Sequence, residues 1–318
     1  MEALADTPPP VTRADIEHAA ERIAGRVRRT PVMRLEAGAF GVEGELVLKL
    51  ELLQRTGSFK LRGAFNRLLS AEVPAAGVVA ASGGNFGLAV ACAARETGHP
   101  AEIFVPDTSP AVKAERIREQ GFPTHIVPGY FAEALEAARE RAAETGAVLM
   151  HAYDQPEVVA GQGTIGKELS DQVPDATTVL VAVGGGGLVA GIASWFAGDV
   201  RIIGVEPRRC PTLTEALRSG GPVDIEVGGL AADSLGSRRA GDIAYATARR
   251  FVEEVVLVED DAIADAQRAL WSACRLIVEP GGAAALAALR SGAYRPRRDE
   301  RVVVVISGAN ADVTSIVG

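Results

Sequence analysis

A lysine stands in the most informative stretch of the sequence, QRTGSFKLRGA at residues 54–64. Lys60 follows a Gly-Ser turn and the aromatic residue Phe59, and it precedes a run with the pattern of a helix. A lysine on a half-buried element loses its proton at modest cost, because desolvation disfavours the ammonium form. A neutral lysine amine is a nucleophile that forms a Schiff base with an aldehyde cofactor. The alternative is a solvated lysine at a helix start, so the surrounding motifs must decide.

A run of four glycines is the second chemical signal. The sequence VGGGGL at 183–188 follows an apolar strand pattern and precedes an apolar helix pattern. Glycines let backbone N–H groups approach an anion closely, and a helix N-terminus adds partial positive charge. The run lacks the Lys-Ser/Thr ending of a P-loop and the spacing of GxGxxG, which disfavours nucleoside triphosphates and NAD. We therefore predict a phosphate site formed by Gly184, Gly185, Gly186, Gly187 and Leu188, rather than a plain flexible turn.

A second strand-to-helix loop has the sequence SGGNFG at 82–87. The N–H groups of Ser82, Gly83 and Gly84 and the Ser82 hydroxyl suit a small anion such as a carboxylate. Asn85 either donates to a phenolate-like oxygen or caps the following helix. Taken alone the cap would be preferred, but beside a lysine and a phosphate site we favour a site for a carboxylate and a cofactor oxygen.

The sequence SGAN at 307–310 closes the last strongly apolar strand pattern, 302–306. Ligands of open α/β sheets bind outside the carboxyl ends of the strands. We therefore expect the three loops and the lysine segment to converge on one crevice. Ser307 offers a neutral hydroxyl there, whereas an aspartate at that position would keep a ring nitrogen protonated.

Short apolar runs alternate with amphipathic segments along most of the chain, which predicts a parallel, doubly wound α/β fold. We expect strands at 77–81, 101–106, 124–127, 147–152, 177–183, 201–205, 254–258 and 301–306. We expect helices at 87–96, 109–120, 132–144 and 162–172. The pattern divides into two domains: a smaller one at 75–151 that grips the substrate, and a larger cofactor-binding one formed by 1–74 and 152–318.

Composition excludes several classes of function. The 318 residues are 47% hydrophobic and carry a net charge of −8, which disfavours binding to nucleic acid or to anionic membranes. No long uncharged apolar run predicts a membrane span, and the N-terminus lacks a signal-peptide pattern. The three cysteines and four histidines are scattered, so we expect reduced thiols, no metal site and a cytoplasmic protein.

Together these motifs resemble the fold-type II pyridoxal-phosphate enzymes, most closely the threonine/serine dehydratase and serine racemase branch. The resemblance spans nearly the whole chain. It is carried by TP at 30–31, KLE at 49–51, GSFKLRGA at 57–64, AGQGT at 160–164, GGGGL at 184–188, GVEP at 204–207, EP at 279–280 and SGAN at 307–310. The cysteine-synthase branch usually has Asp directly after the lysine, where this chain has Leu61. The architecture implied is that of tryptophan synthase β: two twisted, mostly parallel sheets flanked by helices.

The resemblance implies a role for each matching residue. Lys60 would form the Schiff base with pyridoxal 5′-phosphate and then act as general base at the substrate Cα. The remaining cofactor contacts would be Phe59 near the ring, Asn85 at the 3′-oxygen, Gly184, Gly185, Gly186, Gly187 and Leu188 at the phosphate, Ser307 at the pyridine nitrogen, and Glu279 near the ring. Ser82, Gly83, Gly84 and Asn85 would hold the substrate carboxylate. A homodimer is expected on the same basis.

The implied reaction is β-elimination from L-threonine or L-serine, which yields a 2-oxo acid and ammonia. With Ser307 beside the ring nitrogen, the ring should stay largely unprotonated, which favours prompt loss of a β-hydroxyl. A dehydratase for 3-hydroxyaspartate or phenylserine, an amino-acid racemase, and a non-catalytic binding protein on this scaffold are the alternatives. Racemisation is disfavoured, because the position of the second catalytic serine of family racemases is Gly83 here.

Other departures from the family pattern bear on the site. The histidine common in the carboxylate loop is Phe86, and a cofactor-contacting Asn of some relatives is Tyr153. The metal site of relatives pairs Glu206 with a later Asp, but the matching residue is Thr212, which offers no hard anionic oxygen. The usual Ala-Asp-Gly reads ADS at 232–234. The chain ends soon after residue 313, so we expect no C-terminal domain that senses isoleucine.

Overall fold

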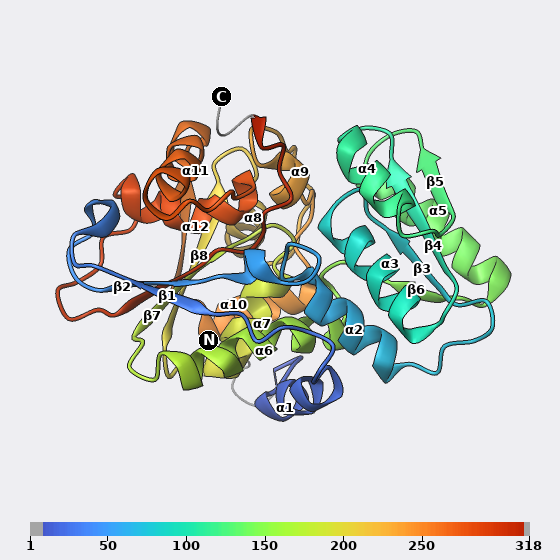
Figure 1. Ribbon diagram of the computed structural model, residues 1–318, viewed down its shortest axis with the longest axis horizontal. Coiled ribbons are helices and arrows are strands. Elements are labelled where there is room, and N and C mark those ends of the chain that lie inside the picture. The colour runs from blue at the N-terminus through green and yellow to red at the C-terminus, as the bar shows by residue number, and fades with distance from the viewer. Residues whose placement is uncertain (1–8, 315–318) are drawn as a thin grey trace.

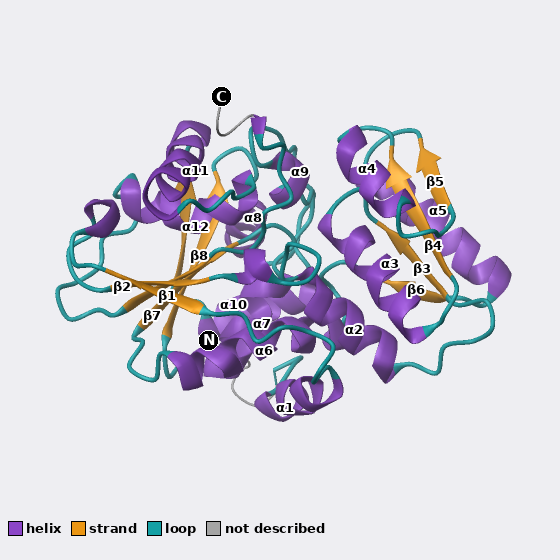
Figure 2. Cartoon of the chain, in the orientation of Figure 1, coloured by secondary structure: helices purple, strands orange, loops and turns teal. Residues whose placement is uncertain are grey.

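Two sheets lie side by side in the computed structural model, which describes residues 9–314 (Figure 1). The larger sheet has six strands in the order β1-β2-β10-β7-β8-β9, and the smaller has four in the order β5-β4-β3-β6. All strand neighbours are parallel except β1 and β2. In Figure 2 helices surround both sheets, so the α/β fold class predicted from the sequence is confirmed.

The strands are short. Those of the larger sheet are β1 (Val32–Leu35), β2 (Leu46–Lys49), β7 (Thr178–Ala182), β8 (Arg201–Pro207), β9 (Glu254–Val258) and β10 (Val302–Val305). Those of the smaller sheet are β3 (Val78–Ala81), β4 (Ala101–Pro106), β5 (Thr124–Val127) and β6 (Val148–Met150). The eight predicted strands are present with small shifts at their ends, whereas β1 and β2 are absent from the prediction.

The helices connect these strands. They are α1 (Arg13–Arg22), α2 (Lys60–Ser70), α3 (Asn85–Thr97), α4 (Ala111–Arg118), α5 (Phe131–Thr145), α6 (Pro156–Gln172), α7 (Gly187–Phe196), α8 (Thr212–Ser219), α9 (Ala232–Leu235), α10 (Asp242–Phe251), α11 (Asp260–Cys274) and α12 (Pro280–Arg290). Two 3₁₀ turns lie at Ala39–Gly41 and Glu51–Leu53. No helix among the described residues is long and apolar enough to span a bilayer.

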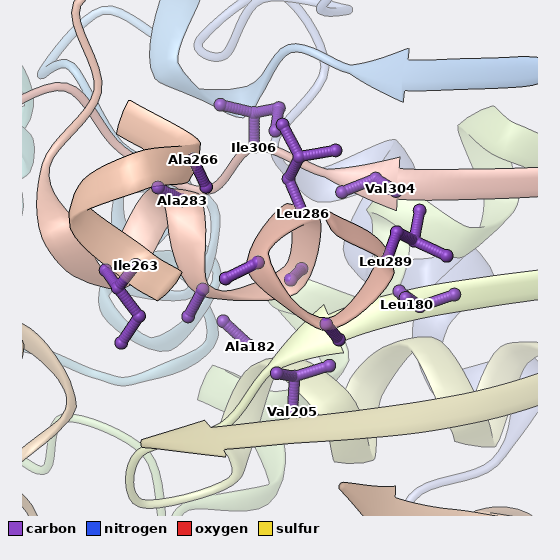
Figure 3. Packing of buried hydrophobic residues seen from close by; sticks show 14 of the residues in the cluster. Leu180, Ala182, Val205, Ile263, Ala266, Ala283, Leu286, Leu289, Val304 and Ile306 are labelled. Atoms are coloured by element: carbon purple, nitrogen blue, oxygen red, sulfur yellow. The ribbon is translucent and has the colours of Figure 1, made fainter. Parts of the chain in front are cut away.

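Apolar side chains cover the larger sheet on both faces. On one face α12 packs along the strands, where Leu286 and Leu289 lie near Leu180 and Val304 (Figure 3). On the other face α6 and α7 contribute residues such as Ile192. All four residues of β10 are buried, as expected for a central parallel strand covered on both sides. The core thereby fixes the carboxyl ends of β7 and β10, where two of the predicted site loops begin.

The smaller sheet is built entirely from residues 78–150, and the strands of the larger sheet lie at 32–49 and 178–305. Helix α2 lies in the connection between the two, packing against α3 of the smaller part and α6 of the larger part. The domain boundaries at residues 74/75 and 151/152 stay a prediction, which limited proteolysis of the folded protein would test.

Candidate active site

One cavity of about 390 Å³ lies at the carboxyl ends of β3, β7 and β10. It is lined by every residue that the sequence places in the site: Phe59, Lys60, Ser82, Gly83, Gly84, Asn85, Gly184, Gly185, Gly186, Gly187, Leu188, Glu279 and Ser307. The loops come from segments separated by more than two hundred residues of chain. The structure therefore brings them together as the strand-end rule predicts, while the role of each residue stays a prediction.

Lys60 is the first residue of α2, and its ammonium group is held inside the cavity. Its Nζ donates to the carbonyl of Ala152 at 2.9 Å and lies 5.1 Å from the centre of the Phe59 ring and 5.8 Å from that of Phe86. Burial lowers the Lys60 pKa from 10.5 to about 8, while the nearby charge of Glu279 opposes that shift. A substantial fraction of the amine is therefore neutral, and nucleophilic, near pH 8.

Two glycines allow the lysine-bearing helix α2 to pack closely against α6. A Cβ on Gly63 would lie 2.4 Å from Nε2 of Gln162 and 2.8 Å from the carbonyl of Val158 on α6. A Cβ on Gly161 would lie 2.7 Å from the Arg62 carbonyl and from the Gly63 Cα. Because both positions lack side chains, the backbones of α2 and α6 meet directly. This contact fixes where Lys60 enters the cavity.

A buried ion network also fixes this helix and links it to α6. Arg62 is fully buried and donates to both oxygens of Glu51, at 2.9 and 2.8 Å, and to both oxygens of Glu168, at 2.7 and 3.0 Å. Lys49 also pairs with Glu168, at 2.5 Å. Two cations thus face two carboxylates, which satisfies the condition for keeping charges out of water. The KLE and KLRGA motifs are explained by this pairing.

The four-glycine loop connects β7 to α7. Gly186 has φ +92°, and a Cβ on Gly185 would lie 2.4 Å from the Tyr153 ring. The Tyr153 ring therefore packs on the loop, and its burial raises the Tyr153 pKa to about 12. Among the described residues, no acceptor takes a hydrogen bond from the N–H groups of residues 184–188. Those donors at a helix N-terminus suit a phosphate dianion.

The loop at 82–85 connects β3 to α3. Gly84 is the N-cap, and Asn85 is the first helical residue with no capping bond. The Asn85 amide instead donates to Oε1 of Glu279 at 2.5 Å, and its oxygen accepts from Asn310 at 2.7 Å. The capping alternative for Asn85 is therefore wrong. The N–H of Gly84 donates to the Ser82 hydroxyl at 3.2 Å, which tightens the turn.

Glu279 is a buried carboxylate at the N-cap of α12. Burial raises its pKa, and the ammonium of Lys113 opposes that rise from 3.5 Å. Lys113 also pairs with Asp233 at 2.6 Å. Lys113 lies on α4, which connects β4 and β5 of the smaller sheet, so a cation from one part of the molecule faces carboxylates of the other. Sequence reasoning missed Lys113, because its partners lie 120 and 166 residues away.

Ser307 follows β10 and is held beside the lysine segment. Its carbonyl accepts from the N–H of Phe59 at 3.1 Å, and Ser58 forms a β-bridge with Gly308. A Cβ on Gly308 would lie 2.0 Å from Oε1 of Glu279 and 3.3 Å from the Cβ of Ser58, so a larger residue there would displace the Glu279 carboxylate. The backbone of the last strand thereby aligns Phe59, Lys60 and Glu279 around one end of the cavity.

A family model described as pyridoxal-phosphate dependent enzyme matches residues 23–308. The chain belongs to the pyridoxal-phosphate-dependent enzyme family. The chain is 37% identical over 311 residues to an L-threonine ammonia-lyase of Thermotoga maritima, a match that covers 96% of this chain and 77% of the relative. It is 39% identical over 306 residues to an L-threonine ammonia-lyase of Geobacter sulfurreducens, covering 95% of this chain and 76% of the relative.

Solved structures agree with this assignment. Maize serine racemase superposes with a TM-score of 0.89 at 31% identity, over 96% of each chain. The processed form of threonine deaminase isoform 2 from Solanum lycopersicum superposes with a TM-score of 0.86 at 30% identity, over 99% of this chain and 93% of that one. The resemblance inferred from the sequence motifs is therefore confirmed.

The residues of this pyridoxal-phosphate enzyme fit the cofactor. Pyridoxal phosphate needs an amine for its aldehyde, donors for its phosphate and a partner for its ring nitrogen. The cavity offers the Lys60 amine, the unpartnered N–H groups of 184–188, and the neutral hydroxyl of Ser307.

Among the described residues, no group of three or more His, Cys, Asp and Glu side chains is arranged to hold a metal ion. Glu206 accepts from the N–H groups of Leu213 and Thr214, at 2.6 and 2.9 Å.

Several other residues line the cavity without a role in the sequence prediction. Ser109 lies in the loop after β4, and Tyr130 and Phe131 lie at the start of α5. Ser237 and Arg238 follow α9. These loops carry no glycine pattern or motif that marks them, and the docking of the two sheets alone brings them to the cavity. They form part of the wall of the cavity.

Proposed function

We propose that this enzyme deaminates L-threonine or L-serine by β-elimination, yielding a 2-oxo acid and ammonia. The observation that carries the proposal is a buried amine, Lys60, with a pKa near 8 in the same cavity as a phosphate-type loop and the 82–85 loop. Relatives named L-threonine ammonia-lyase at 37% and 39% identity support the choice of substrate.

Each group of residues in the cavity has its own role in the proposed reaction. Bound pyridoxal phosphate supplies an aldehyde for the Lys60 amine and an electron-withdrawing ring that stabilises negative charge at the substrate Cα. Residues 184–188 hold the phosphate, and Phe59 packs beside the ring. Asn85 is oriented by Glu279 toward the cofactor oxygen, and Ser82, Gly83, Gly84 and Asn85 bind the substrate carboxylate. Lys60, freed when substrate binds, accepts the Cα proton.

Ser307 sets the direction of the reaction. A hydroxyl leaves a pyridine nitrogen uncharged, whereas a carboxylate would hold it protonated. The weaker electron withdrawal shortens the lifetime of negative charge at Cα, which favours departure of a β-hydroxyl over slower competing reactions. The leaving hydroxyl takes up a proton and departs as water. The unsaturated amino acid that is released tautomerises to an imine, and hydrolysis of this imine by one water molecule yields ammonia and the 2-oxo acid.

A panel of β-hydroxy amino acids tests the proposal. L-threonine, L-serine, 3-hydroxyaspartate and phenylserine are each incubated with the cofactor-loaded protein, and 2-oxo acid release is measured. We expect turnover of L-threonine or L-serine and a loss of at least about a thousandfold in Lys60→Ala. The acidic and aromatic substrates belong in the panel because Arg238, Tyr130 and Phe131 line the cavity. Preferential turnover of either one, or no turnover by the wild type, would overturn the choice of substrate.

Assembly and location are part of the proposal. We propose a homodimer, on the resemblance to the fold-type II family, and light scattering of the purified protein measures its mass directly. Cys92, Cys210 and Cys274 are all free thiols, which suits the reducing cytoplasm. Fractionation of cells that express the tagged protein checks the location.

A further inference from the structure

Gly83 has no side chain, and a serine from another loop fills the space that a side chain would take. A Cβ built on Gly83 lies 1.7 Å from the Oγ of Ser109 and 2.4 Å from its Cβ. Ser109 lies three residues past the end of β4, just before α4. The two residues belong to neighbouring strand ends, since β3 and β4 are paired in parallel. A hydroxyl therefore lies beside the 82–85 loop, and Ser109, which is outside that loop, supplies it.

The surroundings of Ser109 are those of a substrate contact. Ser109 is half-buried and lines the cavity together with Ser82, Gly83 and Gly84. Its backbone N–H is already bonded to the Pro106 carbonyl at 3.0 Å, which fixes the turn that presents the side chain. No described residue exchanges a hydrogen bond with its hydroxyl, and the N–H of Gly83 donates to no described acceptor. Both donors are therefore free to bind an acceptor that enters the cavity.

We propose that Ser109 binds the substrate carboxylate beside the 82–85 loop, and that residue 83 is glycine because Ser109 occupies its side-chain space. This inference rests on the proposed function, since it names a further substrate-contacting residue of the same site. It also changes the interpretation of Gly83, which in the sequence stands for a missing hydroxyl. The glycine leaves room for a hydroxyl that comes from the loop after β4, so the orientation of the substrate depends on where the smaller sheet places that loop.

The first experiment measures folding alone and needs no substrate or cofactor. Gly83→Ala places a methyl group against the Oγ and Cβ of Ser109, and overpacking of this kind costs about 1–3 kcal/mol. We expect the apoprotein Tm to fall by roughly 2–6 °C, and the double variant G83A/S109G to recover most of that loss. An equal Tm for G83A and wild type, or no recovery in the double variant, would contradict the inference that Ser109 occupies the side-chain space of residue 83.

The second experiment moves the hydroxyl. Ser109→Ala removes a hydrogen bond to a charged group, so we expect a rise of about 10- to 100-fold in the KM for the amino acid, with a smaller change in kcat. The variant G83S/S109G puts the hydroxyl back from residue 83 without the Cβ of residue 109 in its way, and should regain part of the affinity. Its matched control is G83A/S109G, which fills the same space without a hydroxyl and should regain none.

Amino-acid binding is also measured without turnover, from the change that each amino acid causes in the absorbance of the bound cofactor. If the wild type eliminates none of the panel, the proposed function fails, whereas the binding and folding measurements still decide the role of Ser109. Unchanged amino-acid affinity in a folded S109A protein would overturn the inference. Equal affinities for G83S/S109G and G83A/S109G would overturn it as well.

Discussion

The amide of Asn85 donates to Oε1 of Glu279 at 2.5 Å, which joins the first turn of α3 to the start of α12. The other oxygen of Glu279 faces Lys113 at 3.5 Å. Desolvation raises the Glu279 pKa, and Lys113 is the first of the groups that lower it. The orientation of Asn85 is thus coupled to a cation on α4, and the charge of Glu279 depends on both parts of the molecule.

Replacing Lys113 with Met should shift the acid side of the pH–activity profile to higher pH. Without the ammonium group the Glu279 pKa rises further, so the carboxylate takes up a proton over more of the pH range. Asn85 then loses its charged acceptor. We expect a loss of about tenfold or more in kcat near neutral pH, recovered in part as the pH rises, in a profile of 2-oxo acid release.

Two variants separate this effect from general damage to α4. Lys113→Arg keeps the cation and should retain the position of the acid limb. Arg118→Met removes a cation from an exposed pair with Glu115 on the same helix, and exposed pairs contribute little. A Lys113→Met profile that superimposes on the wild type after scaling would show that the charge of Glu279 is independent of Lys113.

Capture of the cofactor by the apoprotein should depend on pH through Lys60. Only the neutral amine attacks an aldehyde, and the Lys60 pKa of about 8 means that the neutral fraction rises with pH around that value. We expect the rate of cofactor incorporation, followed by absorbance, to increase through pH 8 and then level off. Because the charge of Glu279 raises the Lys60 pKa, Glu279→Gln should move the midpoint to lower pH. A shift of the midpoint upward would contradict the assigned electrostatics.

Removing the buried guanidinium of Arg62 should destabilise the fold severely. Arg62→Met leaves Glu51 fully buried with Lys49 as its nearest remaining cation, and an uncompensated buried charge costs about 3–5 kcal/mol. The double variant R62M/E51Q removes one charge of each sign and should recover a large part of the loss. Thermal unfolding of the apoprotein measures both. A double variant that is less stable than R62M would show that charge balance is not what holds the network.

The sequence predicted those parts of the site that depend on local chemistry. A lysine after a Gly-Ser turn, glycine loops after apolar strands, and the rule that parallel strands end at one edge sufficed to place Lys60, Asn85 and Ser307 in one cavity. The helix patterns after Lys60 and after the four glycines correspond to α2 and α7, whereas helices α1, α8, α9, α10, α11 and α12 and strands β1 and β2 were not predicted. Strand β1 includes Arg34 and β2 includes the buried Lys49, so a cation interrupts each short apolar run.

Contacts between distant segments were beyond sequence reasoning. The four glycines suggested close approach of an anion, yet the structure shows that Gly185 is also required because the Tyr153 ring lies on it. Gly83 suggested a missing hydroxyl, whereas Ser109 fills its place. Both contacts form only when loops from different strands pack together, and the sequence of either loop alone does not indicate which residue it will contact.

Adding one methyl group to the lysine helix should reduce stability and activity together. Gly63→Ala places a Cβ 2.4 Å from the Gln162 amide and 2.8 Å from the backbone carbonyl of Val158, and backbone cannot yield as a flexible side chain does. We expect a loss of about 1–3 kcal/mol in stability and a fall in kcat, because a displaced α2 carries Lys60 away from its position. Thermal unfolding and steady-state kinetics measure the two effects. Gly221→Ala is the matched control, since a Cβ there meets no atom within 4 Å and the glycine lacks a positive φ. If the Gly63 and Gly221 variants behaved alike, the direct contact of α2 with α6 would not be what positions the lysine.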